Sequence, residues 1–166
     1  MFEYTFWEII TFFGSFHFWT ISSLMCLFLF FLIPKKSRKY FVWFIFLVLP
    51  SILIANSVTQ GLKFIFKIPR PCYGLPYCPS GYSMPSGHTT VAFAALTVLG
   101  LNYKGKKYLI PALLFAQLIG ISRVILGVHT IPDVLIGSFV GMFVAFLVHK
   151  VYEIHYQKFK QIVEKT

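Results

Sequence analysis

Residues 132–149, PDVLIGSFVGMFVAFLVH, decide the fold class, because these eighteen positions hold a single charged residue, Asp133. A helix needs roughly 20 mostly apolar residues to cross about 30 Å of hydrocarbon. Other stretches of the chain approach the same length, and the predicted spans are 17–34, 41–62, 88–103, 108–127 and 132–149. The sequence therefore predicts an all-α integral membrane helix bundle with about five transmembrane helices.

The composition excludes an ordinary soluble protein. Of the 166 residues, 57% are hydrophobic and 12% are charged, which leaves too little polar surface to cover a globule. The net charge of +10 leaves open a nucleic-acid binder or a membrane protein with basic flanks. The 20 Phe and nine Tyr lie in apolar runs, which favours burial in lipid over stacking on bases. We expect one membrane-embedded domain over residues 1–166, whose partner is the lipid bilayer, with no nucleic acid and no obligate protein partner.

The N-terminal segment is apolar but short. As a helix, residues 1–13 are only about 20 Å long, and Gly14 and Ser15 separate them from the first predicted span. We therefore expect a short interfacial helix here. A cleavable signal peptide is disfavoured, because Glu3 and Glu8 stand where Lys or Arg is expected.

Basic residues divide unequally between the two sides of the predicted bundle. Eleven fall on one side: Lys35, Lys36, Arg38, Lys39, Lys104, Lys106, Lys107, Lys150, Lys158, Lys160 and Lys165. Four fall on the other: Lys63, Lys67, Arg70 and Arg123. Because short basic loops stay in the cytoplasm, we expect the loops around 63–88 and 122–133 to face outside. We expect the tail from Lys150 to extend the last helix along the cytoplasmic surface or into water.

Two polar residues at the start of the last predicted span favour a chemical role. Asp133 is the only carboxylate within residues 9–152, and an acid at the end of a span is costly unless it is paired or used. A carboxylate near His129 would hold one tautomer and free the other ring nitrogen as a base or nucleophile. Thr130 is expected to cap the helix, because Pro132 fits only its first turn. A structural polar pair between helices is the alternative.

Pro85, Ser86, Gly87 and His88 precede the third predicted span. If Ser86 caps this helix, the amides of Gly87 and His88 point out of its N-terminus, and Gly87 lets a ligand approach the backbone. The segment therefore predicts an anion site with His88 at its edge. Taken alone, it is also compatible with an ordinary helix cap beside an interfacial histidine.

Three cations complete the pattern. Lys63, Arg70 and Arg123 are predicted on the same side of the membrane as the two histidines, and together they suit a phosphate group. Taken singly, Lys63 and Arg70 are also typical of snorkelling anchors at a membrane interface. One local carboxylate offers no ligand set for Mg²⁺ or a two-metal centre, so no metal and no cofactor are expected.

Together these segments resemble the type-2 phosphatidic acid phosphatase family. The resemblance rests on eleven positions of a three-part signature, Lys63-x6-Arg70-Pro71, Pro85-Ser86-Gly87-His88 and Ser122-Arg123-x5-His129-x3-Asp133. It covers about 63–133 in motif, and the predicted helices on both sides fit the bundle of that family. Many members have six full spans, whereas this chain has a short first segment.

The resemblance implies metal-independent hydrolysis through a phosphohistidine. His129 would be the nucleophile, and Asp133 would orient it and stabilise its charge. His88 would protonate the leaving oxygen and later help to activate water. The phosphoryl oxygens would be held by Lys63, Arg70, Ser86, the Gly87 amide and Arg123.

The expected substrate is a phosphate on a membrane lipid. The short connections between the motifs leave no room for a soluble lid, so the site should open at the lipid surface of the inner membrane, on its periplasmic face. The resemblance favours lipid A 1-phosphate, with phosphatidylglycerol phosphate and undecaprenyl diphosphate as alternatives. A pathway for anions without turnover is a remote alternative of another class.

Two cysteines lie in the predicted outer loop. Five residues separate Cys72 and Cys78, and both the compartment and the spacing allow a disulfide that would stiffen the loop carrying Arg70. We expect the bond in the oxidised protein, and free thiols are the alternative. Cys26 lies within the first predicted span and is expected to be a small packing residue.

Overall fold

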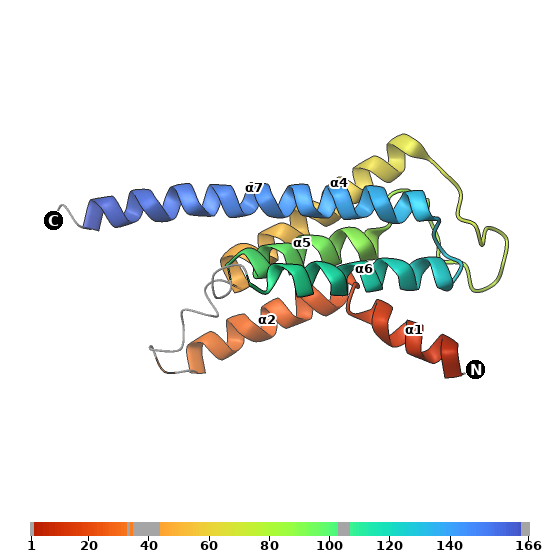
Figure 1. Ribbon diagram of the computed structural model, residues 1–166, viewed down its shortest axis with the longest axis horizontal. Helices are drawn as coiled ribbons and strands as arrows, with labels where there is room; N and C mark the ends of the chain where they lie inside the picture. The colour runs from red at the N-terminus through yellow and green to blue at the C-terminus, as the bar shows by residue number, and fades with distance from the viewer. Residues whose placement is uncertain (1, 33, 35–43, 103–106, 164–166) are drawn as a thin grey trace.

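The computed structural model describes residues 2–32, 34, 44–102 and 107–163, and within them every regular element is helical. The elements are α1 (Phe2–Phe12), α2 (Phe16–Leu32), the short π-helix η2 (Phe44–Val48), α4 (Leu49–Phe66), α5 (Gly87–Asn102), α6 (Leu109–Ile125) and α7 (Ile131–Val163). They form an elongated bundle (Figure 1). The predicted all-α class is confirmed.

Helix α5 is the centre of the bundle. Eleven of its sixteen residues are buried, and it packs against α4, α6 and α7. It is short and apolar on all sides, which is typical of a helix enclosed by others. The outer helices instead expose large apolar side chains, such as Phe31 at 71% and Phe139 at 69%, on surfaces that suit lipid.

Helices α5 and α7 approach each other closely. A Cβ atom added at Gly141 would lie 2.4 Å from the carbonyl oxygen of Thr90, so the helix axes could not stay at this distance with a larger residue. Small residues at helix contacts are a common means of close packing in membranes. This contact helps to set the position of α7, whose first turn holds the site residue Asp133.

The N-terminal segment breaks where the sequence predicts. Helices α1 and α2 meet at a bend of 48°, and the indole Nε1 of Trp19 donates to the Phe13 carbonyl across it, at 2.7 Å. A Cβ at Gly14 would lie 2.5 Å from Ile119 and 3.0 Å from the His88 carbonyl, so the bend itself packs on α5 and α6. Helix α1 is therefore part of the bundle and also contacts α6.

Two helices are long and apolar enough to cross a membrane by themselves, Phe44–Phe66 and Ile131–His155, among the residues that the structure describes. A third span results if the bent pair α1 and α2 counts as one. Helices α5 and α6 are shorter, with 16 and 17 residues, so five separate crossings remain a prediction. The segments 35–43 and 103–106, where most cytoplasmic charges were predicted, lie outside the described residues.

Two predicted boundaries need correction or extension. The second span was predicted to end at residue 62, but α4 continues to Phe66. The helix can include Lys63 in its last turn because the Ser83 carbonyl accepts from the Lys63 ammonium group. The tail from Lys150 is helical as predicted and continues α7 without a break to Val163. At 33 residues this helix is about 50 Å long and projects beyond the bundle (Figure 1).

Candidate active site

The three motifs lie at one end of the bundle (Figure 1, right). This end brings together the C-terminus of α4, the loop 67–86, the N-terminus of α5, the C-terminus of α6 and the N-terminus of α7. Segments that are up to 70 residues apart in the sequence thus contribute to one site. The motif residues there are Lys63, Arg70, Ser86, Gly87, His88, Arg123, His129 and Asp133.

His129 and Asp133 converge as the sequence suggested. The Nδ1 atom of His129 lies 3.4 Å from Oδ2 of Asp133, and the two residues are 3% and 0% exposed. Thr130 precedes α7 at the cap position, and its backbone amide donates to the same Oδ2 at 2.7 Å. An acid in the first turn that accepts from the cap amide is a common device for starting a helix. Here the same carboxylate also holds the histidine ring.

Ser83 is a third partner of this carboxylate. Its hydroxyl donates to Oδ2 of Asp133 at 2.5 Å and lies 3.3 Å from Nδ1 of His129. The side chain is fully buried, and its own amide donates to the Ile68 carbonyl at 2.8 Å, which fixes the loop. Sequence reasoning missed Ser83, because a lone serine outside the motifs has no distinguishing signal.

The other nitrogen of His129 faces Arg70. Nη1 of Arg70 lies 3.0 Å from Nε2 of His129. A guanidinium group can only donate hydrogen bonds, so Nε2 accepts and its proton resides on Nδ1, next to Asp133. The arrangement therefore selects the tautomer in which the Nε2 lone pair points at a cation, where a phosphoryl group bound by that cation would lie.

Burial keeps this imidazole neutral. Burial lowers the pKa of His129 to about 4, with Arg70 and Arg123 acting in the same direction and the hydrogen bond to Asp133 acting against them. The ring is therefore unprotonated at neutral pH, as a nucleophile must be. The turn that presents the ring begins at Gly127, whose φ of 68° ends α6 and lets the His129 amide reach back to the Arg123 carbonyl at 3.3 Å.

Each predicted cation is fixed by the protein itself. Lys63 is 8% exposed, and its ammonium group donates to the carbonyls of Tyr82 and Ser83, so the interpretation of this residue as a snorkelling anchor is wrong. Arg70 donates to the carbonyls of Gly81 at 3.2 Å and Val128 at 3.3 Å. These contacts direct both cations toward the end of the bundle that holds His129.

Arg123 has a partner from the N-terminal helix. Its Nη1 donates to the hydroxyl of Thr11 at 3.0 Å, and Arg123 and Thr11 are each 8% exposed. Its Nε atom is buried without a hydrogen-bond partner among the described residues. Thr11 was not foreseen, because 112 residues separate it from Arg123 and no motif includes it.

The predicted anion site begins α5. Ser86 is fully buried and immediately precedes the helix, where its carbonyl accepts from the amide of Thr90 at 2.9 Å and its hydroxyl accepts from the hydroxyl of Thr89 at 3.0 Å. A Cβ added at Gly87 would meet only the Thr59 methyl, at 3.8 Å, so internal packing does not require glycine there. His88 lies in the first turn of α5 and interacts electrostatically with Arg123 and His129.

The loop 67–86 is cross-linked. The sulfur atoms of Cys72 and Cys78 are bonded, with their Cα atoms 5.4 Å apart, and Cys26 is a free thiol. The loop reverses direction at Lys67, whose φ of 51° ends α4. Cysteine bonding, turn geometry and the Arg70 contacts together give this loop a defined shape near the site.

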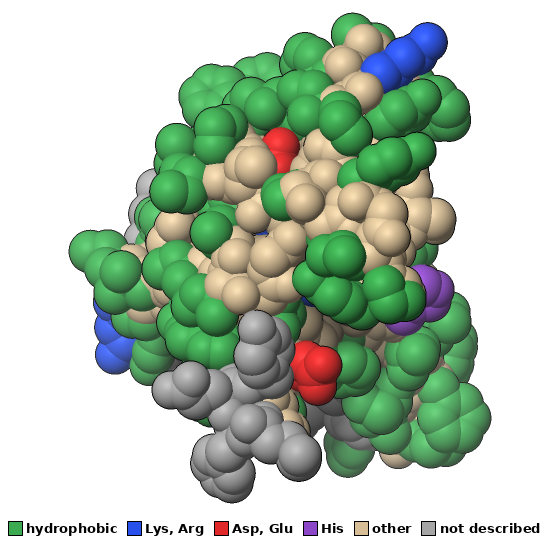
Figure 2. Space-filling model, turned by 90° about the vertical axis from the view of Figure 1, so that its right-hand side faces the viewer, with side chains coloured by type: hydrophobic (Ala, Val, Ile, Leu, Met, Phe, Trp, Pro, Cys, Tyr) green, Lys and Arg blue, Asp and Glu red, His purple; other side chains and the backbone are tan. Residues whose placement is uncertain are grey.

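Several cavities adjoin these groups, among them two with predicted cations in their walls. One, of about 270 Å³, is lined by Lys63 and its neighbours on α4 and by Arg70 and other residues of the loop 67–86. The other, of about 570 Å³, lies between α1, the cross-linked loop and the end of α6, with Arg123 in its wall. Figure 2 shows this end of the molecule, where apolar side chains form much of the rim and the blue of Lys and Arg is nearly hidden near the middle.

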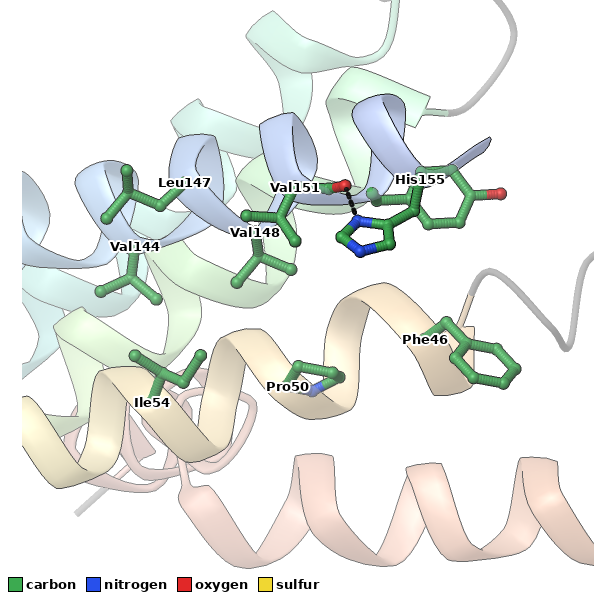
Figure 3. A pocket seen from close by; sticks show the side chains of 9 residues that line it. Phe46, Pro50, Ile54, Val144, Leu147, Val148, Val151 and His155 are labelled. Carbon is green, nitrogen blue, oxygen red and sulfur yellow. Dashed lines mark hydrogen bonds between the residues drawn. The ribbon is translucent and has the colours of Figure 1, made fainter. Parts of the chain in front are cut away.

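Another cavity lies far from the motifs. It is an apolar groove of about 410 Å³ between α7 and the segment η2–α4, shown in Figure 3. Its one imidazole, of His155, bonds to the Val151 carbonyl of its own helix at 2.9 Å. No Lys, Arg, Asp or Glu is among its described lining residues, and we do not assign the site to it.

Comparison with known proteins supports the resemblance. The sequence profile of the PAP2 superfamily matches residues 45–156. A lipid A 4'-phosphatase of Porphyromonas gingivalis is 31% identical over 147 residues, which are 81% of this chain and 61% of that protein. A lipid A 4'-phosphatase of Helicobacter pylori is 36% identical over 106 residues, 57% of this chain and 50% of that protein. The chain thus spans between half and three-fifths of these relatives.

Solved structures show the same architecture. The crystal structure of a transmembrane PAP2-type phosphatidylglycerolphosphate phosphatase from Bacillus subtilis is similar with a TM-score of 0.75 and 27% identity, over 92% of this chain and 77% of that one. The crystal structure of Aquifex aeolicus LpxE has a TM-score of 0.65 and 25% identity, over 89% of this chain and 85% of that one. The predicted membrane helix bundle is confirmed by these similarities.

Proposed function

Because the chain belongs to the PAP2 superfamily, we propose that it is a lipid phosphatase of the membrane that works through a phosphohistidine on His129. The observation that supports this most directly is the state of the His129 ring. Its Nδ1 side contacts Asp133 and its Nε2 lone pair faces the Arg70 guanidinium at 3.0 Å. A phosphoryl group held by Arg70 would be within reach of that lone pair.

In the first step Nε2 attacks phosphorus, and the bond from phosphorus to the leaving oxygen breaks. The imidazole gains positive charge, which the Asp133 carboxylate stabilises from the Nδ1 side. Lys63, Arg70 and Arg123 bind the phosphoryl oxygens with Ser86 and the Gly87 amide, and they offset the charge that grows there. His88, which the negative charge of the bound phosphate keeps protonated, gives its proton to the leaving oxygen and becomes neutral.

In the second step water attacks the phosphohistidine. The bond between phosphorus and Nε2 breaks, and the electron pair returns to the ring. His88, now neutral, takes the proton from water, so the site is regenerated when phosphate leaves. The proposed steps use cations of the chain in place of a metal.

The proposed substrate is a lipid whose headgroup bears a phosphomonoester or diphosphate. We favour lipid A, since both relatives described above are named as lipid A phosphatases. The 1-phosphate, which the sequence resemblance favours, is the first position to test. The 4'-phosphate is the second, because both relatives are named as 4'-phosphatases. Phosphatidylglycerol phosphate and undecaprenyl diphosphate are the alternative substrates.

The chain is an integral membrane protein, and its proposed place is the inner membrane with the site on the periplasmic face. The support is the distribution of basic residues that the sequence predicts, eleven on one side and four on the other. A cysteine introduced near Tyr82 should react with a membrane-impermeant reagent added from outside. Reaction near Lys104 in its place would reverse the assignment.

The test of function is phosphate release by the detergent-purified chain with EDTA present. Lipid A, phosphatidylglycerol phosphate, phosphatidic acid and undecaprenyl diphosphate are compared, beside the His129→Ala variant. Release that disappears in His129→Ala, together with loss of a trapped phosphoenzyme, is expected. The His88→Ala variant should still form phosphoenzyme from a substrate with a good leaving group. Near-normal rates in both variants would contradict the assigned roles.

A further inference from the structure

The cavity of about 570 Å³ is lined by two groups of opposite charge. Arg123 forms part of its wall, and Glu8 of α1 is another lining residue. Thr11, which bonds to Arg123, also lines it, and Glu8 lies one turn away on the same face of α1. The cavity is therefore lined by a cation of the phosphate site and by a carboxylate that lies one turn of α1 before Thr11, the partner of that cation.

The remaining walls come from two other segments. Tyr77 and Pro79 of the cross-linked loop form one, and the last residue of α6 with the three that follow it, Ile125–Val128, form another. Val128 also accepts from Arg70 through its carbonyl, so this wall is shared with the cation that faces His129. The cavity consequently adjoins the proposed site of phosphate transfer.

A ligand is further indicated by Arg123 itself. The side chain is 8% exposed, and its Nε–H is buried with no partner within the described ranges, although buried donors are nearly always satisfied. An acceptor on a molecule in the cavity would satisfy it. The volume lies within the usual range of small-molecule sites.

From these observations we propose that the cavity holds the sugar of a glycolipid headgroup while its phosphate is at Arg123 and His129. Glu8 accepts hydrogen bonds from the hydroxyl or amino groups of the sugar. Tyr77, which is 64% exposed, offers a ring on which the apolar face of the sugar packs. The cavity lies at the end of the bundle that carries the charged motifs, where headgroups rather than acyl chains are found.

This inference rests on the proposed function and deepens it. Phosphatidic acid and undecaprenyl diphosphate have no sugar. The third lipid, phosphatidylglycerol phosphate, has only a glycerol phosphate headgroup, which is smaller than a sugar and would fill less of the cavity. The site should therefore favour lipid A over all three lipids. Loss of the Glu8 carboxylate should matter only for a substrate with donors in the cavity.

The first experiment compares Glu8→Gln with wild type on lipid A and on phosphatidic acid. We expect kcat/KM for lipid A to fall about tenfold, because the charged carboxylate acceptor is replaced by a weaker, neutral amide acceptor. We expect kcat/KM for phosphatidic acid to stay within about twofold. The matched control is Glu153→Gln. Glu153 lies in the C-terminal part of α7, away from the site, and pairs with His149 at 3.3 Å. Equal losses on both lipids, or a wild type that prefers phosphatidic acid, would overturn the proposal.

The second experiment needs no turnover. In the His129→Ala background, alkylation of Ile125→Cys, which lines the cavity, is measured by peptide mass spectrometry with lipid A or phosphatidic acid present. Ile121→Cys is the control, since Ile121 has a similar exposure, 41% against 45%, one turn earlier in α6. Protection of residue 125 by lipid A alone supports the sugar site even if no lipid is hydrolysed. No protection overturns the site while leaving the phosphatase function to its own test.

Discussion

Removing the Ser83 hydroxyl should weaken turnover by loosening the pair that orients His129. The hydroxyl donates to Oδ2 of Asp133 at 2.5 Å, and Oδ1 of the same carboxylate is already buried without a partner within the described residues. The Ser83→Ala variant would leave this carboxylate with two donors, from Thr130 and His129. The Asp133 carboxylate would then be held less firmly, and its negative charge would be stabilised by one hydrogen bond fewer.

The size of the effect follows from the kind of bond. Hydrogen bonds to charged groups contribute about 1.5–3 kcal/mol, and about 1.4 kcal/mol corresponds to a tenfold change in rate. Because Thr130 and His129 continue to hold the carboxylate, the lower part of that range applies. We expect Ser83→Ala to lower kcat roughly 10–30-fold with little change in KM.

The assay is phosphate release together with the rate of phosphoenzyme formation. A double-mutant cycle with Asp133→Asn separates positioning from general damage, because Ser83→Ala should cost less than about twofold once the carboxylate is absent. Ser57→Ala, at an exposed serine on α4, is the matched control and should have no effect. If Ser83→Ala costs as much in the Asp133→Asn background as in the wild type, the reasoning is refuted.

Three further outcomes are expected. Thr11→Val, which removes the acceptor of Arg123, should raise KM about three- to tenfold in steady-state kinetics, and unchanged KM would separate α1 from the site. Gly141→Leu should lower both the melting temperature and the activity, because its first side-chain atom would lie 2.4 Å from the Thr90 carbonyl; an unchanged thermal transition would contradict the close packing. On the acid side of the pH profile, kcat/KM corrected for titration of the substrate should decline with a midpoint near pH 4, because protonation of His129 removes the nucleophile. A midpoint near pH 6.5 would show that the pKa of His129 is that of an ordinary histidine and would contradict this reasoning.

The sequence alone determined the fold class and the identity of the motif residues. Apolar length is a local property, so runs such as 132–149 predict a membrane bundle before any packing is known. The spacings from Ser122 to Asp133 and the segment 85–88 likewise specify histidine, carboxylate and cation chemistry by residue type. Their convergence at one end of the bundle followed from the alternation of the spans.

Only the tertiary structure decided how the site is held. Ser83 and Thr11 are common residue types, and their roles depend on contacts with Asp133 and Arg123 across 50 and 112 residues of sequence. The sequence predicted that a carboxylate holds one tautomer of His129 but did not say which ring nitrogen is free, whereas the contact with the Arg70 guanidinium identifies Nε2. Such contacts depend on how the loop 67–86 and the helices pack together, and that packing is set by side chains throughout the bundle rather than by any single segment.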